Sequence, residues 1–253
     1  MLLKELEKIK NEFESNLRRV ESLLDFDHVI LDKTLEVIEQ LQTSLSGVKG
    51  FAVFHLKSLN NTINQLSSIK SHQSTKINYE TISNQCVVLL ISYLSSALQQ
   101  LLEVYINCYP AKISQRKQEN IKINLSSILN TEGTLKEKLG EIILNSDSQV
   151  SFQDMRSIRD TFKEYAQIDI DWDNTVNNII FAQAARHCIV HNSGIADTKF
   201  RNQIKIAKQR TIKTEFNSEE VVFKKEEVKE LKKEILNFFN KYFDKMVEKP
   251  VDE

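Results

Sequence analysis

The feature that most constrains this chain is its shortage of turn-forming residues. Its 253 residues include only 5 glycines and 2 prolines, whereas a fold of many short strands needs such residues at most of its turns. Long helices need few turns, so the sequence predicts an all-α fold, a helical bundle. Hydrophobic residues make up 41% of the chain and charged residues 27%, a balance typical of a globular protein that buries a core.

Apolar residues at intervals of three and four predict where the first helices lie. Asp25-Phe26-Asp27 interrupts the first such run, so we expect two helices there rather than one. We divide the chain into an N-terminal helical extension, residues 1–70, and a helical domain, residues 71–253. The extension either packs on the domain through its apolar stripe or forms a partner-binding hairpin. Its expected elements are helices over 2–24, 30–45 and 51–69, followed by a polar loop over 71–78.

The helical domain is expected to form around a central core helix over 81–107, the most apolar segment, which stops before Pro110. Alternating apolar and charged residues over 212–216 and 221–223 predict a small β-hairpin before the last helix, which is expected over 225–248. Side chains that can cap a helix start mark the other helices: Thr134 with Glu137 as a capping box, Ser151 with Asp154, one of the loop aspartates Asp169, Asp171 and Asp173 before a helix over about 172–191, and Asp197.

Charge and cysteine content indicate the surroundings in which the protein works. The net charge of -1 gives no overall attraction to nucleic acid or to a membrane, so any such attraction must come from local clusters. The N-terminus lacks the layout of a secretory signal, and we find no continuous apolar run near the ~18 residues of a membrane span. Cys86, Cys108 and Cys188 have no CxxC spacing and are expected to be free thiols. We therefore expect a cytoplasmic protein without a membrane partner.

Polar side chains gather where the apolar run 179–185 ends. Arg186, His187, His191 and Asn192 fall within seven residues, and Gly194 is expected to end the helix in a left-handed conformation. A guanidinium binds phosphate oxygens through two parallel hydrogen bonds. A histidine titrates near neutrality and can take up or release a proton. RNA cleavage without a metal needs these groups, because the 2′-hydroxyl must lose a proton, the phosphate must be held and the 5′-oxygen must gain a proton.

The same residues could instead bind a metal or serve only to end the helix. His187 and His191 are one helical turn apart, as in a zinc-binding helix, but Cys188 stands where a zinc protease has Glu. Since the sequence supplies no further ligand cluster, we expect no metal and no cofactor. In a purely structural role, His191 would cap helix carbonyls and Arg186 would form a surface ion pair.

A run of basic residues follows the motif and favours contact with nucleic acid. No acidic residue occurs from position 198 to position 214. Such a cluster is usually only a solvated helix face, but beside a phosphate-binding motif it is a candidate RNA track. The residues predicted to contact RNA are Lys199, Arg201, Lys205, Lys208 and Arg210.

At this motif the chain resembles a known superfamily. The segment Arg186-His187-Cys188-Ile189-Val190-His191-Asn192 matches the Arg-polar-x-x-x-His signature of the HEPN (higher eukaryotes and prokaryotes nucleotide-binding) superfamily. The surroundings, over roughly 77–243, resemble stand-alone bacterial HEPN ribonucleases of the MAE-like and RiboL-PSP types. The resemblance implies a helical bundle that forms a homodimer in which two motifs face one cleft. By position, Arg186 and His191 would be catalytic and His187 their polar companion, with Asn192 next to them.

The resemblance also implies a function. It predicts a metal-independent endoribonuclease that cleaves RNA to 2′,3′-cyclic phosphate ends, in a toxin–antitoxin or anti-phage defence system with an antitoxin or other partner protein. Many relatives carry an acidic residue in the middle of the core helix, where this chain has Ser95-Ser96-Ala97, and Glu103 is an uncertain substitute. One alternative is therefore a catalytically silent HEPN module that binds RNA, a nucleotide or a protein. Another is a structural oligomer built on the N-terminal helices.

Overall fold

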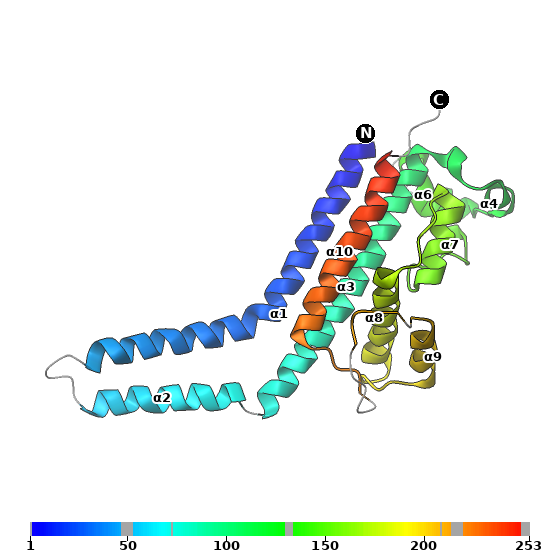
Figure 1. Ribbon diagram of the computed structural model, residues 1–253. Coiled ribbons are helices and arrows are strands. Elements are labelled where there is room, and N and C mark those ends of the chain that lie inside the picture. Colours follow the sequence, from blue (N-terminus) through cyan, green and yellow to red (C-terminus); the bar gives the residue numbers. More distant parts are fainter. Residues whose placement is uncertain are drawn as a thin grey trace.

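The computed structural model describes residues 2–46, 53–71, 73–129, 134–207, 209–213 and 220–248. These residues form an all-α helical bundle in which three long helices run side by side (Figure 1). The long helices are α1 (Leu2–Ser46), α3 (Gln73–Cys108) and α10 (Lys225–Glu248). Shorter helices cover the other side of α3: α6 (Leu135–Ser146), α7 (Met155–Ala166) and α8 (Asn174–His191). Helix α9 (Thr198–Ile206) packs on α8. Three small helices connect α3 to α6: η1 (Pro110–Lys112), α4 (Gln115–Asn120) and α5 (Leu125–Leu129).

Helix α3 is the centre of the bundle, since it packs against α1 and α10 and also against α6, α7 and α8. Leu90, Leu94 and Leu98 along it are almost completely buried. The predicted core helix is thus confirmed, but it begins at Gln73, so the predicted loop is wrong over residues 73–78. The polar composition of that segment misled the prediction, because a polar segment can continue a helix that tertiary packing already stabilises.

Part of α3 is also long and apolar enough to cross a membrane. Residues Ile77–Cys108 meet that condition by length and composition, although no uninterrupted apolar run is found there. The core helix of a bundle meets the same condition, and Val87, Leu94 and Leu101 are buried among the neighbouring helices. We therefore assign α3 to the protein core.

Helix α1 is continuous from Leu2 to Ser46, so the predicted break at Asp25-Phe26-Asp27 is wrong. The Asp25 carboxylate does not cap a new helix. It forms ion pairs with Lys225, at 2.7 Å, and with Lys229, at 3.1 Å, at the start of α10. The apolar face of α1 is buried as far as Leu24. On this face the Phe13 ring centroid lies 4.3 Å from that of Phe239 in α10.

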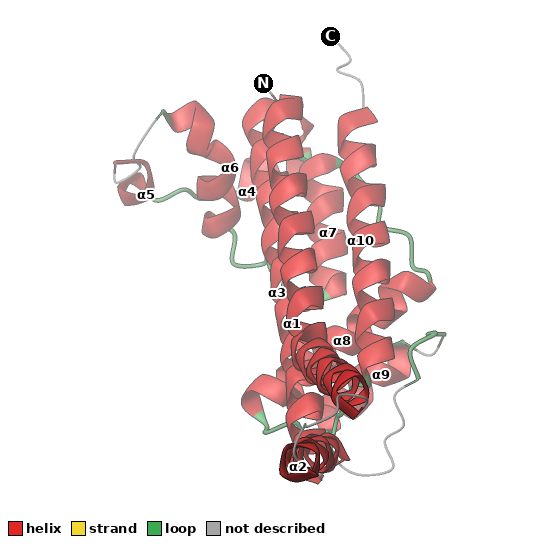
Figure 2. Cartoon of the chain, turned by 90° about the vertical axis from the view of Figure 1, so that its left-hand side faces the viewer, coloured by secondary structure: helices red, strands yellow, loops and turns green. Residues whose placement is uncertain are grey.

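Beyond Leu24, α1 leaves the bundle and pairs with α2 (Val53–Ser71) to form a two-helix arm, which Figure 2 views end-on. Among the arm residues whose side chains the structure describes, none between positions 25 and 71 is fully buried. Phe26, Ile30 and Leu41 on its surface are each about half exposed. The segment 1–70 is therefore divided, since its first half packs in the bundle and its second half extends away from it.

The helix start predicted at Asp197 is found, whereas α7 begins after Asp154 and not at Ser151, and α8 begins at Asn174, two residues later than predicted. Each capping aspartate accepts a hydrogen bond from the backbone N–H three residues later, which satisfies a donor that has no partner within the helix. The three bonds are Asp154 with Ser157 at 2.9 Å, Asp173 with Val176 at 2.9 Å and Asp197 with Phe200 at 2.7 Å. In α6, the Thr134 N–H donates to the Glu137 carboxylate at 3.3 Å.

The predicted β-hairpin is not found among the described residues, and positions 214–219 of it lie outside them. Instead, Glu220 forms an isolated antiparallel bridge with Ile195, and the Val221 N–H donates to the Gly194 carbonyl at 2.8 Å. The Asn84 side chain in α3 donates to the Val221 carbonyl at 2.8 Å and accepts from the Phe223 N–H at 3.1 Å. A side chain of α3 thus makes two bonds that a partner strand would otherwise supply. The alternating pattern arises because Val221 and Phe223 are buried.

We predict that Gly140→Ala destabilises the protein. The backbones of α6 and α3 approach closely at this residue, because an added Cβ would lie 2.2 Å from the Glu103 carbonyl oxygen and 2.7 Å from its Cα. Backbone must shift to relieve the clash, which is expected to cost about 1–3 kcal/mol of unfolding free energy. This outweighs the ~1 kcal/mol that alanine normally adds in a helix. Urea unfolding followed by circular dichroism measures the change.

The matched control for this prediction is Lys136→Ala, an exposed position in the same helix. Its unfolding free energy is expected to stay within about 0.5 kcal/mol of wild type. Equal stability of the Gly140→Ala and Lys136→Ala proteins would contradict the close approach of α6 to α3.

Candidate functional site

A pocket of about 480 Å³ lies at the C-terminal end of α8, next to the start of α7 and to α9. Helix α8 lines it with positions three or four residues apart, which fall on one face of a helix. The pocket residues of α8 are Ile180, Gln183, Arg186, His187 and His191, and those of the other segments are Gln153, Asp154, Met155, Arg156, Trp172, Lys199, Gln203 and Ile206.

The pocket brings together three of the four predicted catalytic residues: Arg186, His187 and His191. The ring centroids of His187 and His191 are 5.0 Å apart and their planes are inclined by 50°. Lys199, the first of the predicted RNA-binding residues, lines the same pocket from α9. A guanidinium, which is able to bind phosphate, and imidazoles, which are able to transfer protons, therefore face a common space.

Asn192, the fourth predicted catalytic residue, does not line the pocket and shapes the loop that follows α8. Its side-chain amide donates to the Ile195 carbonyl at 2.7 Å, and its backbone N–H donates to the Cys188 carbonyl at 2.9 Å. Gly194 has the expected left-handed conformation, with φ at 80°, and Ser193 before it is also left-handed, at 51°. This second left-handed residue was not predicted from the sequence.

The other predicted RNA-binding residues lie outside the pocket. Arg201 and Lys205 are exposed on α9, and Lys208 lies outside the described residues. Arg210 is turned toward the protein. Its guanidinium donates to the carbonyls of Ala207, at 3.1 Å, and Ile212, at 3.0 Å, and lies 4.7 Å from the centroid of the Phe181 ring. We therefore assign Arg210 to closing the loop after α9.

The charge of Arg186 is not neutralised by an ion pair among the described residues. Its Nη1 donates to the neutral Gln153 side-chain oxygen at 2.8 Å, and its Nε is buried without a hydrogen-bond partner. The surface ion pair expected for a purely structural Arg186 is thus absent from the described part of the chain. A guanidinium held by an amide keeps its positive charge available for an anion.

The pocket carries an excess of positive charge. Arg156, Arg186 and Lys199 line it, against the single carboxylate of Asp154, which already accepts hydrogen bonds from the backbone and hydroxyl of Ser157. Burial lowers the pKa of the His187 imidazole from its ordinary value, and the nearby Lys199, His191 and Arg186 add to that effect while Asp197 opposes it. His187 is accordingly neutral at pH 7 and can accept a hydrogen bond.

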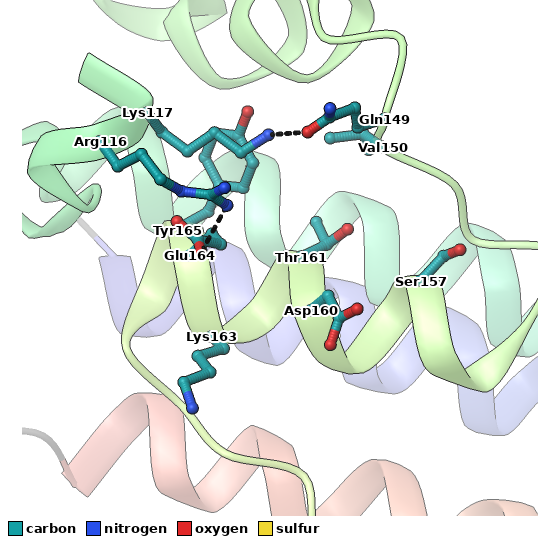
Figure 3. Close-up of a pocket in the computed structure, with 10 residues that line it drawn as sticks. All are labelled: Arg116, Lys117, Gln149, Val150, Ser157, Asp160, Thr161, Lys163, Glu164 and Tyr165. Carbon is teal, nitrogen blue, oxygen red and sulfur yellow. Dashed lines mark hydrogen bonds and ion pairs between the residues drawn. The ribbon is translucent and has the colours of Figure 1, made fainter. Parts of the chain in front are cut away.

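A second pocket, of about 390 Å³, lies between α4 and α7 but differs in its electrostatics (Figure 3). Each charged side chain that lines it already has an ion-pair partner, so its charges neutralise one another. The ion pairs of Arg116 and Lys117 hold α4 against α7 and against the loop that precedes α7. The pairs are Arg116 with Glu164 at 2.8 Å, Lys117 with Asp147, Lys163 with Asp169 at 3.5 Å and Asp160 with Arg159 at 3.1 Å.

Three buried amide side chains of α8 were missed from the sequence, although they interrupt an apolar run and so gave a signal. The Gln183 oxygen accepts from the Met155 N–H at 3.0 Å, which joins the start of α7 to α8. Asn177 donates to the Gln209 carbonyl at 2.9 Å. Asn178, completely buried, accepts from the N–H groups of Thr211, at 3.1 Å, and Ile212, at 3.2 Å. These bonds fix the segments on both sides of the pocket.

Ser95, in the middle of α3, contacts the segment before α7. The Ser95 hydroxyl donates at 2.7 Å to the carbonyl of Phe152, the residue before Gln153. Ser95 thus holds the segment from which Gln153 reaches Arg186. Glu103 does not line the pocket, because it lies where α3 meets Gly140 of α6, and its carboxylate accepts from Gln99 at 2.8 Å.

Comparisons with protein-family models, with characterised proteins and with solved structures gave no match to this chain. The resemblance to HEPN proteins therefore rests on the motif and on its surroundings. Among the residues that the structure describes, no cluster of three or more His, Cys, Asp or Glu side chains is placed to hold a metal ion.

We predict that His187 makes folding stability depend on pH. Its pKa in the folded protein lies below the ordinary value of 6.5, so the unfolded chain binds a proton at a higher pH than the folded protein does. Stability is therefore retained above about pH 6.5 and falls as the pH decreases from there toward the folded pKa. His187→Gln removes this titration. Urea unfolding at about pH 7.5 and about pH 5.5 should show a smaller loss for the variant than for wild type.

The control is Ser58→Ala, because Ser58 is an exposed position on the arm and its side chain does not titrate in this pH range. This variant should lose as much stability as wild type between the two pH values. If His187→Gln also lost as much as wild type, the lowered pKa of His187 would be refuted.

Proposed function

We propose that the protein is an endoribonuclease that needs no metal and uses Arg186 and His191 to cleave RNA to 2′,3′-cyclic phosphate ends. The observation that carries the proposal is the pocket at the end of α8, where Arg186, His187 and His191 meet in an excess of positive charge. That arrangement fits the Arg-polar-x-x-x-His signature, because the motif residues face a space that an RNA phosphate can enter.

Arg186 binds the scissile phosphate in the proposed reaction. Gln153 occupies one of the five N–H donors of the guanidinium, so the remaining donors include those needed for two phosphate oxygens. Negative charge builds on these oxygens when the 2′-oxygen attacks phosphorus. Fixed donors stabilise that charge more in the transition state than in the bound substrate, which lowers the barrier.

Histidines carry the protons in the proposed reaction. One imidazole removes the proton of the ribose 2′-hydroxyl, the 2′-oxygen forms a bond to phosphorus, and the bond from phosphorus to the 5′-oxygen breaks. A second imidazole gives its proton to that 5′-oxygen, so one proton is gained and one is lost and no water is consumed. We assign these roles to the exposed His191 and to His191 of the partner subunit in a homodimer. The neutral His187 serves as their hydrogen-bonding companion.

The RNA path extends from the pocket over α9. Lys199 lies in the pocket, while Arg201 and Lys205 are exposed further along the same helix. Each cation that neutralises a phosphate releases counterions, so binding is expected to weaken as salt rises. Following the family resemblance, we place the enzyme in the cytoplasm, in a toxin–antitoxin or anti-phage system with a partner protein that controls it.

One observation favours a second candidate function, a HEPN module that binds RNA without cleaving it. This chain has Ser95-Ser96-Ala97 where many relatives carry an acidic side chain, and Glu103 does not line the pocket. If that carboxylate is required for cleavage, the phosphate site would remain and the reaction would be lost. Binding and cleavage must therefore be measured separately.

We predict that Arg186→Ala and His191→Ala each reduce cleavage of an end-labelled single-stranded RNA by roughly 100-fold or more, since a positioned acid or base contributes 10²–10⁴-fold. Wild-type cleavage should persist in EDTA, because no step uses a metal. Gel analysis of purified proteins measures both results, and circular dichroism verifies that the variants fold.

Arg201→Ala is the matched control, since it removes the same charge from an exposed position outside the pocket. It should change the cleavage rate only a few-fold at low salt. Equal cleavage by wild type, Arg186→Ala and His191→Ala would contradict the proposed enzyme. RNA binding without cleavage by wild type would support the binding module instead.

A further inference from the structure

The chain's single tryptophan lies at the pocket that holds the motif. Trp172 precedes α8, lines the pocket and keeps 40% of its surface exposed. Two contacts hold its ring. The indole N–H donates to the Asn177 side-chain oxygen at 3.2 Å, and the Arg159 guanidinium lies 5.3 Å from the ring centroid. The largest aromatic side chain is thus kept in a fixed position while much of its surface remains open to solvent.

The same pocket contains buried polar atoms without hydrogen-bond partners. Gln183, Arg186 and Gln203 each have such an atom, and all three line this pocket. Gln183, which is only 8% exposed, has an unpaired amide donor, and Gln203 has an unpaired oxygen acceptor. Buried polar groups are normally paired, because leaving them without a partner costs free energy. Their concentration here indicates a ligand that carries both a donor and an acceptor.

A nucleobase has the chemistry that these groups require. It offers a flat π face to an aromatic ring, and its edge carries hydrogen-bond donors and acceptors. The pocket volume of about 480 Å³ lies within the ≈ 300–1,000 Å³ of small-molecule sites. A base inside a duplex cannot enter, because both of its faces are stacked on neighbours and its pairing edge is occupied.

We propose that this pocket binds one unstacked nucleobase next to the scissile phosphate, with the base stacked on Trp172 and its edge bonded to Gln183 and Gln203. The inference rests on the proposed ribonuclease function and specifies its substrate class. The substrate is single-stranded or loop RNA, and duplex RNA is refused. Trp172 is a binding residue here, and the base it holds places the neighbouring phosphate against Arg186.

The intrinsic fluorescence of Trp172 tests this directly, because no other tryptophan contributes to the signal. The protein is the His191→Ala variant, so that RNA is not consumed during titration. Three probes are compared: a single-stranded RNA octamer, the same octamer in a duplex, and inorganic polyphosphate, which has charge but no bases. The octamer is expected to quench the fluorescence to saturation. The duplex and polyphosphate are expected to leave it nearly unchanged.

Variants separate stacking from a structural role of Trp172. Trp172→Ala should weaken octamer binding by roughly tenfold or more, as expected for loss of one base–aromatic stack. Trp172→Phe keeps an aromatic face and should restore most of the affinity. Phe26→Ala removes a comparably exposed aromatic side chain from α1, at a place outside the pocket, and should bind like wild type. Fluorescence anisotropy of labelled RNA measures all four proteins.

The outcomes distinguish this inference from the proposed function. RNA cleavage by wild type together with unchanged binding and cleavage by Trp172→Ala would overturn the stacking inference and leave the ribonuclease in place. Binding of the octamer without a decrease in Trp172 fluorescence would also overturn the stacking inference and leave the ribonuclease in place. If wild type neither bound nor cleaved RNA, the proposed function would fail and the inference would fail with it.

Discussion

The burial of α8 is the constraint on which the rest of the site depends. Phe181, Ala182 and Ala185 are completely buried, and α8 packs against α3, α9 and α10. The small alanines allow neighbouring helices to approach closely, so the helix has little freedom to rotate or slide. Its last turn emerges at the edge of the core, and the motif therefore appears at a fixed place, with His191 exposed and Cys188 buried.

Hydrogen bonds between neutral groups extend this constraint to the Arg186 guanidinium. Ser95 of α3 holds the Phe152 carbonyl, Gln183 of α8 holds the Met155 N–H, and between them Gln153 receives a hydrogen bond from Arg186. Because every partner in this series is neutral, the guanidinium is positioned without losing its charge to a carboxylate. The paired charges of the pocket between α4 and α7 show the opposite arrangement, in which ion pairs join two segments and leave no net charge for a ligand.

Local sequence signals predicted the parts of the fold that depend on neighbouring residues. The Asp197 cap and the last helix, Lys225–Glu248, are found as predicted, because capping and apolar spacing act within a few residues. Long-range contacts account for the features that were not predicted. Asp25 pairs with α10 and does not end α1, Asn84 of α3 bonds the segment that resembled a hairpin strand, and Arg210 turns toward Phe181 and not toward solvent. The motif itself was recognisable, but the pocket around it depends on Trp172 and Gln203, which no local pattern marked.

The central claim is that the groups at the end of α8 activate a ribose 2′-hydroxyl. The most direct test compares cleavage of one single-stranded RNA with cleavage of the DNA of the same sequence by the purified protein in EDTA. We predict that the RNA is cut to fragments ending in 2′,3′-cyclic phosphate and that the DNA stays intact, because it lacks the attacking hydroxyl. Cleavage of both strands at similar rates, or RNA fragments without cyclic phosphate ends, would contradict the account.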